Sequence, residues 1–384
     1  MNAVLSLVAR LSQIAAILIS WSAKLGWRVV TRSPLEGPMM ARELFERLGG
    51  SFLKFGQILS LQIDVLPKEY CDAFLSLLDQ VPPIPREDVD RVFLEELGKS
   101  PMEVFAEFHY EPLAAASIGQ VHKATLKDHT VVAVKIQRPG IRKTFERDNH
   151  VLEAMVWVIL TFRIRRLYFM RDAVRELTTW TLDELDYRRE AAYCQLLGEN
   201  AKASPTERVP KVYVEFSRMR VLTMEFLHGP SVAKYLRMIE AKDEAGLAKL
   251  KEEGFVATIF SSNVISNFLS DAFRFGVFHA DLHPANLLIL PGNVVGYVDF
   301  GIVAVLTQEA RRKQIELTMA YASGDAGAIY RGFLNICIVS PDADLKGLRR
   351  KIQQLTGKWY HDASPGAQAR FRVSVTETDR KSVV

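Results

Sequence analysis

The chain of 384 residues is long enough for two or three domains, and its net charge of +4 is small for that length. Hydrophobic residues make up 48% of it, which excludes a disordered chain, and the weak charge argues against a dedicated nucleic-acid binder, so we expect no nucleic-acid partner. The three cysteines, Cys71, Cys194 and Cys337, form no CxxC pair, which excludes a thiolate zinc site and suits a reducing cytosolic compartment.

The first region, residues 1–37, is apolar and ends in a segment rich in helix breakers. Arg10 interrupts the apolar run, and 11–23 is too short to cross a bilayer, which takes about 20 apolar residues. Basic residues together with Trp21 and Trp27 are typical of a helix that lies in a membrane interface. A helix that packs on the rest of the protein is an equally good interpretation, and both stay open.

The second region, 38–100, carries apolar residues at helical spacing and reaches a group of prolines at 82–85. We therefore predict a helical extension here. The third region, 101–227, begins with two β-rich runs joined by a polar turn at 127–129, a pattern that predicts an antiparallel hairpin.

Helices are predicted over 142–199, followed by a strand pair at 212–216 and 221–226. The fourth region, 228–384, is mostly helical as far as about residue 274, and one small strand is expected at 294–298. A strand-rich lobe followed by a helical lobe gives an α+β, two-lobed architecture, with charged motifs at the junction.

The strongest chemical signal is the sequence HADLHPANLLIL, which begins at His279, followed by VVGYVDFG. Asp281 stands five positions before Asn286, and Asp299 stands thirteen positions after Asn286. This is the spacing of a kinase catalytic loop and its DFG aspartate. Phosphoryl transfer needs oxygen ligands for magnesium, assigned here to Asn286 and Asp299, and a carboxylate that orients the acceptor, assigned to Asp281. A solvated turn rich in aspartate is the alternative.

Lys135 stands at the end of the β-branched run VAVK, and a lysine on a buried strand is costly unless it is paired. In kinases this lysine holds the α and β phosphates and pairs with a helical glutamate. The candidate partners are Glu184, Asp186 and Glu190. We favour Glu190, because the two alanines that follow it allow close approach to the sheet. An exposed helical face remains the alternative for any one of the three.

The segment before Lys135 takes the place of the glycine-rich loop that covers the phosphates in kinases. Only the third glycine position remains, at Gly119, where we expect a positive φ and backbone amides that approach phosphate. An alanine run alone favours a helix or tight core packing, but its place just before the lysine strand favours the loop. The expected nucleotide-binding residues are Ala114, Ala115, Ala116, Ser117, Ile118, Gly119, Val121 and Lys135.

Together these residues resemble the UbiB/aarF-domain family of atypical kinases, over about 45–340. The sequence KFGQ at 54–57 is similar to the family's KxGQ motif, and PLAAASIGQVH to its alanine-rich loop. The acids Glu184 and Asp186 match its ExD motif, and HADLHPANLL resembles its catalytic loop. Two departures, Leu282 and Ala285, fall inside that loop and leave the expected ligands in place.

The resemblance implies a protein-kinase-like fold with an added helical extension whose KxGQ helix lies over the active site. It implies regulatory or catalytic roles for Lys54, with Gly56 and Gln57 beside it, and contacts of Glu184 and Asp186 with the extension. Glu225, in the strand 221–226, joins the nucleotide-binding set. The implied cofactors are ATP and Mg²⁺, with Mn²⁺ as an alternative.

The family resemblance also implies ATPase activity in ubiquinone biosynthesis at the cytoplasmic face of the bacterial inner membrane. The implied partners are ATP or ADP, a membrane lipid or quinone precursor, and a quinone-biosynthesis complex. Many bacterial relatives continue into hydrophobic C-terminal anchors, whereas this chain ends in the polar stretch TETDRKSVV, as a truncated or divergent short member would. Membrane contact is then expected from the N-terminal helix and from the basic run at 163–166, although such a run is more often a solvated face.

After the DFG motif at 299–301, only 302–306 precede a new helix. We expect Thr307 to cap this helix, with Glu309 in its first turn. No long activation segment or APE element is present, so little remains to bind a peptide. The sequence favours an ATPase or a small-molecule kinase. A nucleotide-switched pseudokinase that serves a lipid-synthesis complex, and a true protein kinase, are the alternatives.

Overall fold

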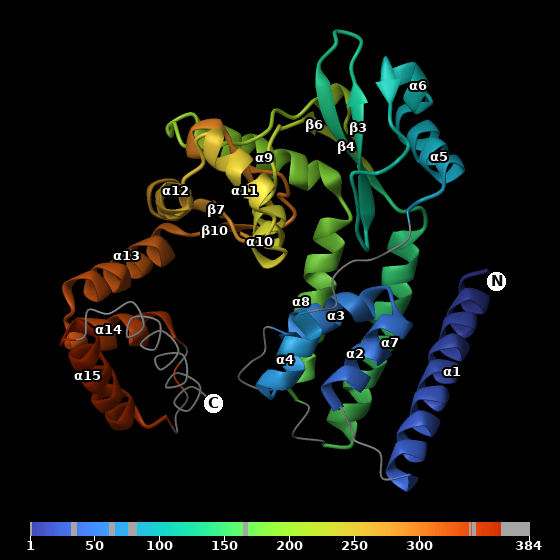
Figure 1. Ribbon diagram of the computed structural model, residues 1–384. Helices are drawn as coiled ribbons and strands as arrows, with labels where there is room; N and C mark the ends of the chain where they lie inside the picture. Colours follow the sequence, from blue (N-terminus) through green and yellow to red (C-terminus); the bar gives the residue numbers. More distant parts are fainter. Residues whose placement is uncertain are drawn as a thin grey trace.

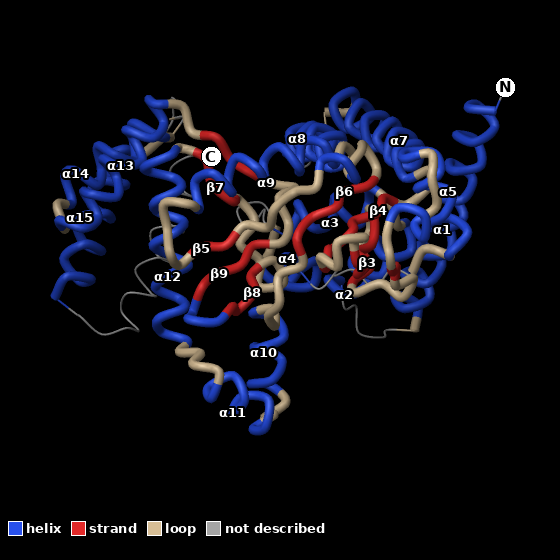
Figure 2. The backbone as a smooth tube through the Cα atoms, turned by 90° about the horizontal axis from the view of Figure 1, so that it is seen from above, coloured by secondary structure: helices blue, strands red, loops and turns tan. Residues whose placement is uncertain are grey.

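The computed structural model describes residues 2–31, 37–60, 66–75, 83–163, 168–337, 339 and 343–361 (Figure 1). Its parts are a helical unit, a strand-rich lobe and a mainly helical lobe, which confirms the two-lobed α+β architecture expected from the sequence. In the view of Figure 2, from above, the strands of the two lobes lie between α13, α14 and α15 on one side and α1 and α7 on the other.

The helical unit combines the N-terminal extension with two helices inserted later in the chain. Its members are α1 (Asn2–Val30), α2 (Gly37–Leu48), α3 (Ser51–Ser60), α4 (Lys68–Leu75), α7 (Ile141–Thr161) and α8 (Phe169–Glu184). Phe52, Phe55, Leu152 and Leu177 share one buried core, so the inserted helices hold the extension in place. Within the described ranges, no helix is both long enough and apolar enough to cross a membrane.

The strand-rich lobe is an antiparallel sheet ordered β1-β3-β4-β6, with β2 added beside β3. The strands are β1 (Glu107–Phe108), β2 (Ala114–Ala115), β3 (Gly119–Thr125), β4 (Val131–Gln137) and β6 (Val221–Glu225). The predicted hairpin is confirmed as β3–β4, and His129, with φ 69°, lies in its turn. The strand predicted at 212–216 is wrong: Val214–Phe216 is a 3-10 turn (η2), because the chain reverses after one bridge to Met224.

One face of this sheet is covered by α5 (Arg86–Leu97) and α6 (Pro101–Val104). Val89, Val92 and Phe93 of α5 are fully buried against the sheet. The sequence division places these residues with the extension, but their packing groups α5 with the strands.

The second lobe combines short strands with several helices. They are α10 (Val232–Glu240), α11 (Glu244–Glu252), α12 (Ala257–Ser270), the π-helical turn η3 (Asp271–Phe275), β7 (Val277–His279), β8 (Leu287–Leu290), the 3-10 turn η4 (Pro291–Asn293), β9 (Val294–Tyr297), β10 (Val303–Val305), α13 (Gln308–Ser323), α14 (Ala326–Ile336) and α15 (Leu345–His361). β8 and β9 form a hairpin beside β5 (Glu207–Arg208), and β7 pairs with β10. Of these strands, β9 is the one that the sequence predicted. Thr307 caps α13 as expected, accepting a hydrogen bond from the amide of Ala310.

The two lobes meet around α9 (Tyr187–Ala201). Side chains of α9 share one core with β6, β8, β9 and α12, and Cys194 and Leu222 within it are fully buried. Because α9 packs against both lobes, it fixes the position of one lobe relative to the other.

A buried pair of carboxyl groups lies within the second lobe, between β5, which pairs with β9, and η3. Glu207 of β5 and Asp271 of η3 are 9% and 5% exposed and share a side-chain hydrogen bond. Desolvation, together with the neighbouring carboxyl group, raises the pKa of Glu207 to about 8, and desolvation raises the pKa of Asp271 to about 6. The pair therefore holds a proton at neutral pH.

This pair predicts that the folded chain loses stability as pH rises. Both pKa values lie above those of the unfolded chain, so the stabilisation is complete below the ordinary carboxyl pKa and is lost as pH rises through about 6 to 8. In Glu207→Gln the melting temperature should fall less steeply between about pH 5 and pH 9 than in the wild type. Glu309→Gln, on the exposed start of α13, is the control. Equal slopes in all three proteins would contradict the assignment.

Gly119 lies in β3 and not in a positive-φ turn, so the conformation expected for it is wrong. Its glycine serves close packing instead. A Cβ there would lie 2.4 Å from the carbonyl oxygen of Ile136 and 2.6 Å from Oη of Tyr187.

We therefore expect Gly119→Ala to destabilise the fold by about 1–3 kcal/mol through overpacking, measured by thermal or urea unfolding. Gly26→Ala is the matched control, because a Cβ at that helical position meets nothing within 4 Å and alanine favours a helix. A Gly119→Ala protein as stable as Gly26→Ala would refute the packing role.

Candidate functional site

The pattern of β4 decides where Lys135 lies. Val132, Val134 and Ile136 are fully buried on the face that α5 covers, so Lys135 belongs to the opposite face. There its Nζ lies 2.5 Å from Oε1 of Glu190 on α9, with side chains 14% and 6% exposed. The lysine–glutamate pair expected from the sequence is present.

Asp299 completes a three-charge cluster. Its Oδ2 lies 3.3 Å from Nζ of Lys135, and its Oδ1 accepts a hydrogen bond of 2.9 Å from the amide of Gly301. The amide of Phe300 donates to Oε1 of Glu190 at 3.2 Å, and the Phe300 ring is fully buried. Glu190 thus binds the lysine and the backbone of the DFG segment with one oxygen.

The charges set each other's protonation. Burial opposes the ionised form of Lys135, but Asp299 and Glu190 together raise the pKa of the ammonium above its usual value. The Asp299 side chain is 44% exposed, and its partial desolvation opposes ionisation, but Lys135 and the Gly301 amide hold its pKa below the usual range. Burial raises the pKa of Glu190, and Lys135 opposes that shift. Lysine is therefore charged and Asp299 ionised at neutral pH.

The β8–β9 hairpin brings the catalytic-loop residues to the same place. Leu287 pairs with Tyr297, so the residues just outside the hairpin face each other, and the amide of Val298 donates to the carbonyl of Asn286 at 3.2 Å. Nδ2 of Asn286 donates to Oδ2 of Asp281 at 2.9 Å. The amide of Asp281 in turn donates to Nδ1 of His279 at 3.1 Å.

These oxygens fit a magnesium ion in part. The nitrogen of the Asn286 amide group is bound to Asp281, which leaves its oxygen for a cation, and the Asp299 side chain is 44% exposed. Mg²⁺ prefers hard oxygen ligands and keeps waters and phosphate oxygens besides one or two protein groups. Among the described residues no cluster of three or more His, Cys, Asp or Glu could hold a metal by itself. The side-chain oxygens of Asn286 and Asp299 therefore suit a magnesium ion whose remaining ligands are phosphate oxygens and waters.

The alanine-rich segment forms strand β2, neither a helix nor a core element. Ala114 and Ala115 pair with β3, and the amide of Ala116 donates to the carbonyl of Gly119 at 2.8 Å, closing a tight turn over 116–119. Arg138, the residue after β4, binds this turn. Its Nε donates to the Ala116 carbonyl at 2.9 Å, and its amide donates to the carbonyl of Ile118 at 2.8 Å. Ser117 lies in this turn, and Val121 of β3 lies opposite Lys135.

Lys54 of α3 forms an ion pair with Glu184, the last residue of α8. A Cβ on Gly301 would lie 3.9 Å from Cγ of Glu184, so this pair adjoins the DFG segment. Gly56 is buried within α3, and the side chain of Gln57 lies outside the described residues. Asp186 caps α9 and binds Arg188 at 2.7 Å; its contacts within the described ranges are local.

Glu225 ends β6, but its carboxylate contacts are with Arg208 at 2.5 Å and the amide of Lys211 at 3.1 Å. It lines a groove of about 470 Å³ that also includes Phe226 and His228. Sequence reasoning missed Tyr187, a buried residue whose ring centroid lies 5.6 Å from Nζ of Lys135. Its place directly after the ExD acids was the only local signal for it.

Comparison with known proteins identifies the family. The ABC1 atypical kinase-like domain matches residues 76–332, a range that contains Lys135, Glu190, Asp281, Asn286 and Asp299. The Arabidopsis thaliana chloroplastic protein ACTIVITY OF BC1 COMPLEX KINASE 1 is 32% identical over 100% of this chain and 55% of its own length. A Pseudomonas fluorescens protein named probable protein kinase UbiB is 35% identical over 74% of this chain and 52% of its own.

A solved structure, the Rv3197–erythromycin complex from Mycobacterium tuberculosis, superposes with a TM-score of 0.52 and 25% identity over 96% of this chain and 93% of that one. This chain spans only about half the length of the two named relatives above. The match of the domain to two-thirds of the sequence shows that the chain belongs to the ABC1 atypical kinase-like (UbiB) family.

Proposed function

We propose that the chain binds ATP with Mg²⁺ and hydrolyses it, or transfers its terminal phosphoryl group to a small acceptor. The observation that carries this proposal is the contact of Lys135 with both Glu190 and Asp299, beside the Asp281–Asn286 pair. A cation, a metal-binding carboxylate and a further carboxylate within one site are what phosphoryl transfer requires.

In this mechanism Lys135 binds the α and β phosphates, and Asn286 and Asp299 hold Mg²⁺, which neutralises phosphate charge. Asn286 also orients Asp281, whose carboxylate positions a water or hydroxyl oxygen for attack on the γ-phosphorus. As the new P–O bond forms, the bond to the β-phosphate oxygen breaks and ADP leaves. Asp281 accepts the proton of the attacking oxygen.

The acceptor is proposed to be water or a small molecule. The segment after Gly301 enters β10 at Val303, which pairs with β7, and α13 begins at Gln308, so it leaves little backbone free to bind a peptide. The Lys54–Glu184 pair also places α3 beside the DFG segment. A protein kinase, as the UbiB relative's name has it, and a nucleotide-switched pseudokinase remain the competing functions.

We expect Asp299→Asn to lower Mg²⁺-dependent ATP turnover by at least about 100-fold, because a preorganised charge that stabilises the transition state is lost. Phosphate release by the purified chain measures this. Glu309→Gln removes a carboxylate from the exposed start of α13 and should leave turnover unchanged. Full turnover in Asp299→Asn would refute the metal assignment, and label transfer to protein exceeding phosphate release would favour the protein kinase.

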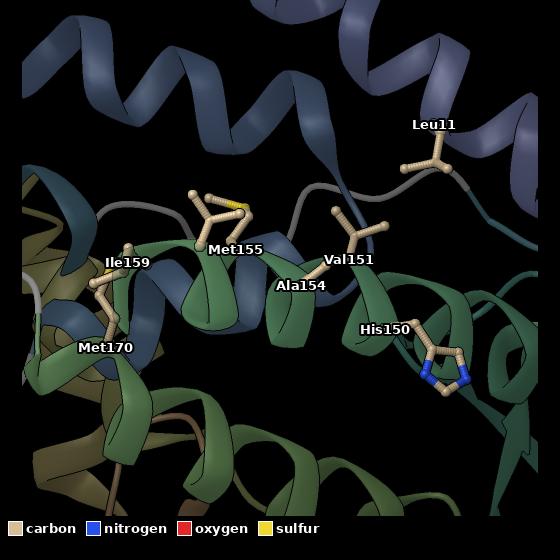
Figure 3. Close-up of a pocket in the computed structure, with 8 residues that line it drawn as sticks. Leu11, His150, Val151, Ala154, Met155, Ile159 and Met170 are labelled. Carbon is tan, nitrogen blue, oxygen red and sulfur yellow. The ribbon is translucent and has the colours of Figure 1, made fainter. Parts of the chain in front are cut away.

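The biological role we propose is support of quinone-lipid biosynthesis at the cytoplasmic face of a bacterial inner membrane. The surface that supports lipid contact is a groove of about 540 Å³ between α1, α7 and α8. Figure 3 shows Leu11 of α1 across from Val151, Ala154 and Met155 of α7. Among the described residues that line this groove, His150 is the one polar side chain, and we propose that a hydrocarbon chain of a membrane lipid occupies the groove.

The end of α7 favours a lipid over other apolar occupants. Trp157 and Phe162 are 66% and 71% exposed, and the exposed Arg163 follows them, a combination of aromatic and cationic groups that suits a membrane interface. Arg163 begins the basic run at 163–166, and the remainder of that run lies outside the described residues.

Met155→Glu should therefore reduce co-sedimentation of the chain with phosphatidylglycerol vesicles several-fold, because it places a charge in the groove. Met102→Glu, the same change at a comparably exposed methionine on α6, is the matched control. Equal vesicle binding by both variants would refute the proposal that this groove contacts the membrane.

A further inference from the structure

A buried carboxylate on α7 holds the N-terminus of α3, the helix that carries Lys54. The Asp148 side chain is fully buried. Its Oδ2 accepts a hydrogen bond of 3.0 Å from the amide of Ser51, the first residue of α3, across 97 positions of sequence. Helix N-termini have unpaired amides and a positive dipole end, so a carboxylate there stabilises both.

α3 has no cap of its own. The two residues before it are Gly49 and Gly50, with φ of 62° and 54°, and neither carries a side-chain oxygen. A Cβ on Gly50 would lie 2.3 Å from Oδ2 of Asp148. The glycine thus provides the conformation and the room that let a distant aspartate serve as cap.

Arg10 of α1 neutralises this aspartate. Its Nε and Nη2 donate to the two carboxylate oxygens of Asp148 at 2.7 and 3.1 Å, and Nη2 also donates to the carbonyl of Leu48, which ends α2. A buried carboxylate is costly without a partner charge. One guanidinium therefore ties α1 to the end of α2, to α7 and, through Asp148, to the start of α3.

Lys54 lies three positions beyond Ser51, on the same side of α3, and meets Glu184 beside the DFG segment. We propose that Asp148 and Arg10 are positioning residues of the nucleotide site, which fix the start of α3 and thereby keep Lys54 on Glu184. α1 thus controls how tightly α3 covers the site. This regulation rests on the nucleotide-binding function proposed above.

The experiment measures Lys54 directly in the full chain. Arg10→Met should raise the rate at which an amine-reactive reagent modifies Lys54, read by mass spectrometry, by roughly fivefold, the size expected when a helix cap is weakened. Lys68 of α4, whose side chain is 80% exposed, is the internal reference for reagent reactivity. Amide exchange at the start of α3 should rise in parallel.

Lys24→Met is the matched control variant. Lys24 also ties α1 to the helical unit, but through Glu43 of α2 and without contact to α3. Arg10→Lys keeps the charge and should restore most of the protection of Lys54. Equal labelling in Arg10→Met and Lys24→Met, at equal melting temperature, would overturn the proposal.

A double-mutant cycle separates positioning from general destabilisation. If Asp148 acts through Lys54, Asp148→Asn should change ATP affinity in the wild-type background and have no further effect in Lys54→Met. Additive effects would overturn the proposal. Labelling of Lys54 needs no nucleotide, so a chain that fails to turn over ATP but still shows the labelling shift would refute the proposed activity and leave the positioning role standing.

Discussion

The ion pair between Lys135 and Glu190 is the interaction on which the rest of the site depends. Both side chains are almost buried, so neither charge is stable there without the other. The same oxygen of Glu190 also accepts the amide of Phe300. One carboxylate therefore joins β4, α9 and the segment that carries Asp299, and a shift of α9 would move all three.

Such a pair contributes little net stability, because the desolvation of two charges offsets most of their attraction. The surrounding packing supplies the stability instead. β4 directs three fully buried aliphatic side chains toward α5, and α9 packs Cys194 into the core shared with the second lobe. The apolar layers hold the strand and the helix at a distance where the pair can form, and the pair then fixes their orientation.

The sequence was sufficient for residues whose signal is local. Lys135 follows a β-branched run, and Asp281, Asn286 and Asp299 keep a recognisable spacing, so charged motifs at the junction of the lobes could be expected. The β8–β9 hairpin that brings Asn286 and Asp299 together could not. The strands β7, β8 and β10 were missed because three or four residues carry no measurable period. The positive φ expected at Gly119 was wrong because its constraint is the approach of Ile136 and Tyr187, which only the assembled sheet creates.

Contacts between segments that are distant in the chain produce no local pattern in the sequence, so they could not be predicted from it. Arg10 and Asp148 are 138 positions apart, and an aspartate inside a helix ordinarily indicates an exposed face. The absence of a capping side chain before Ser51 was visible in the sequence, but not the residue that replaces it.

The segment from Glu184 to Glu190 links the helical extension to Asp299, the proposed metal ligand. Glu184 ends α8 and takes Lys54, Asp186 caps α9, and Glu190 lies one turn into that helix and holds Lys135 and the Phe300 amide. Only six positions separate the residue that contacts the extension from the residue that orients the DFG segment. A displacement of Lys54 that pulls on Glu184 would therefore reach Asp299 through the start of α9, because Glu190 binds the amide of Phe300, the residue next to Asp299.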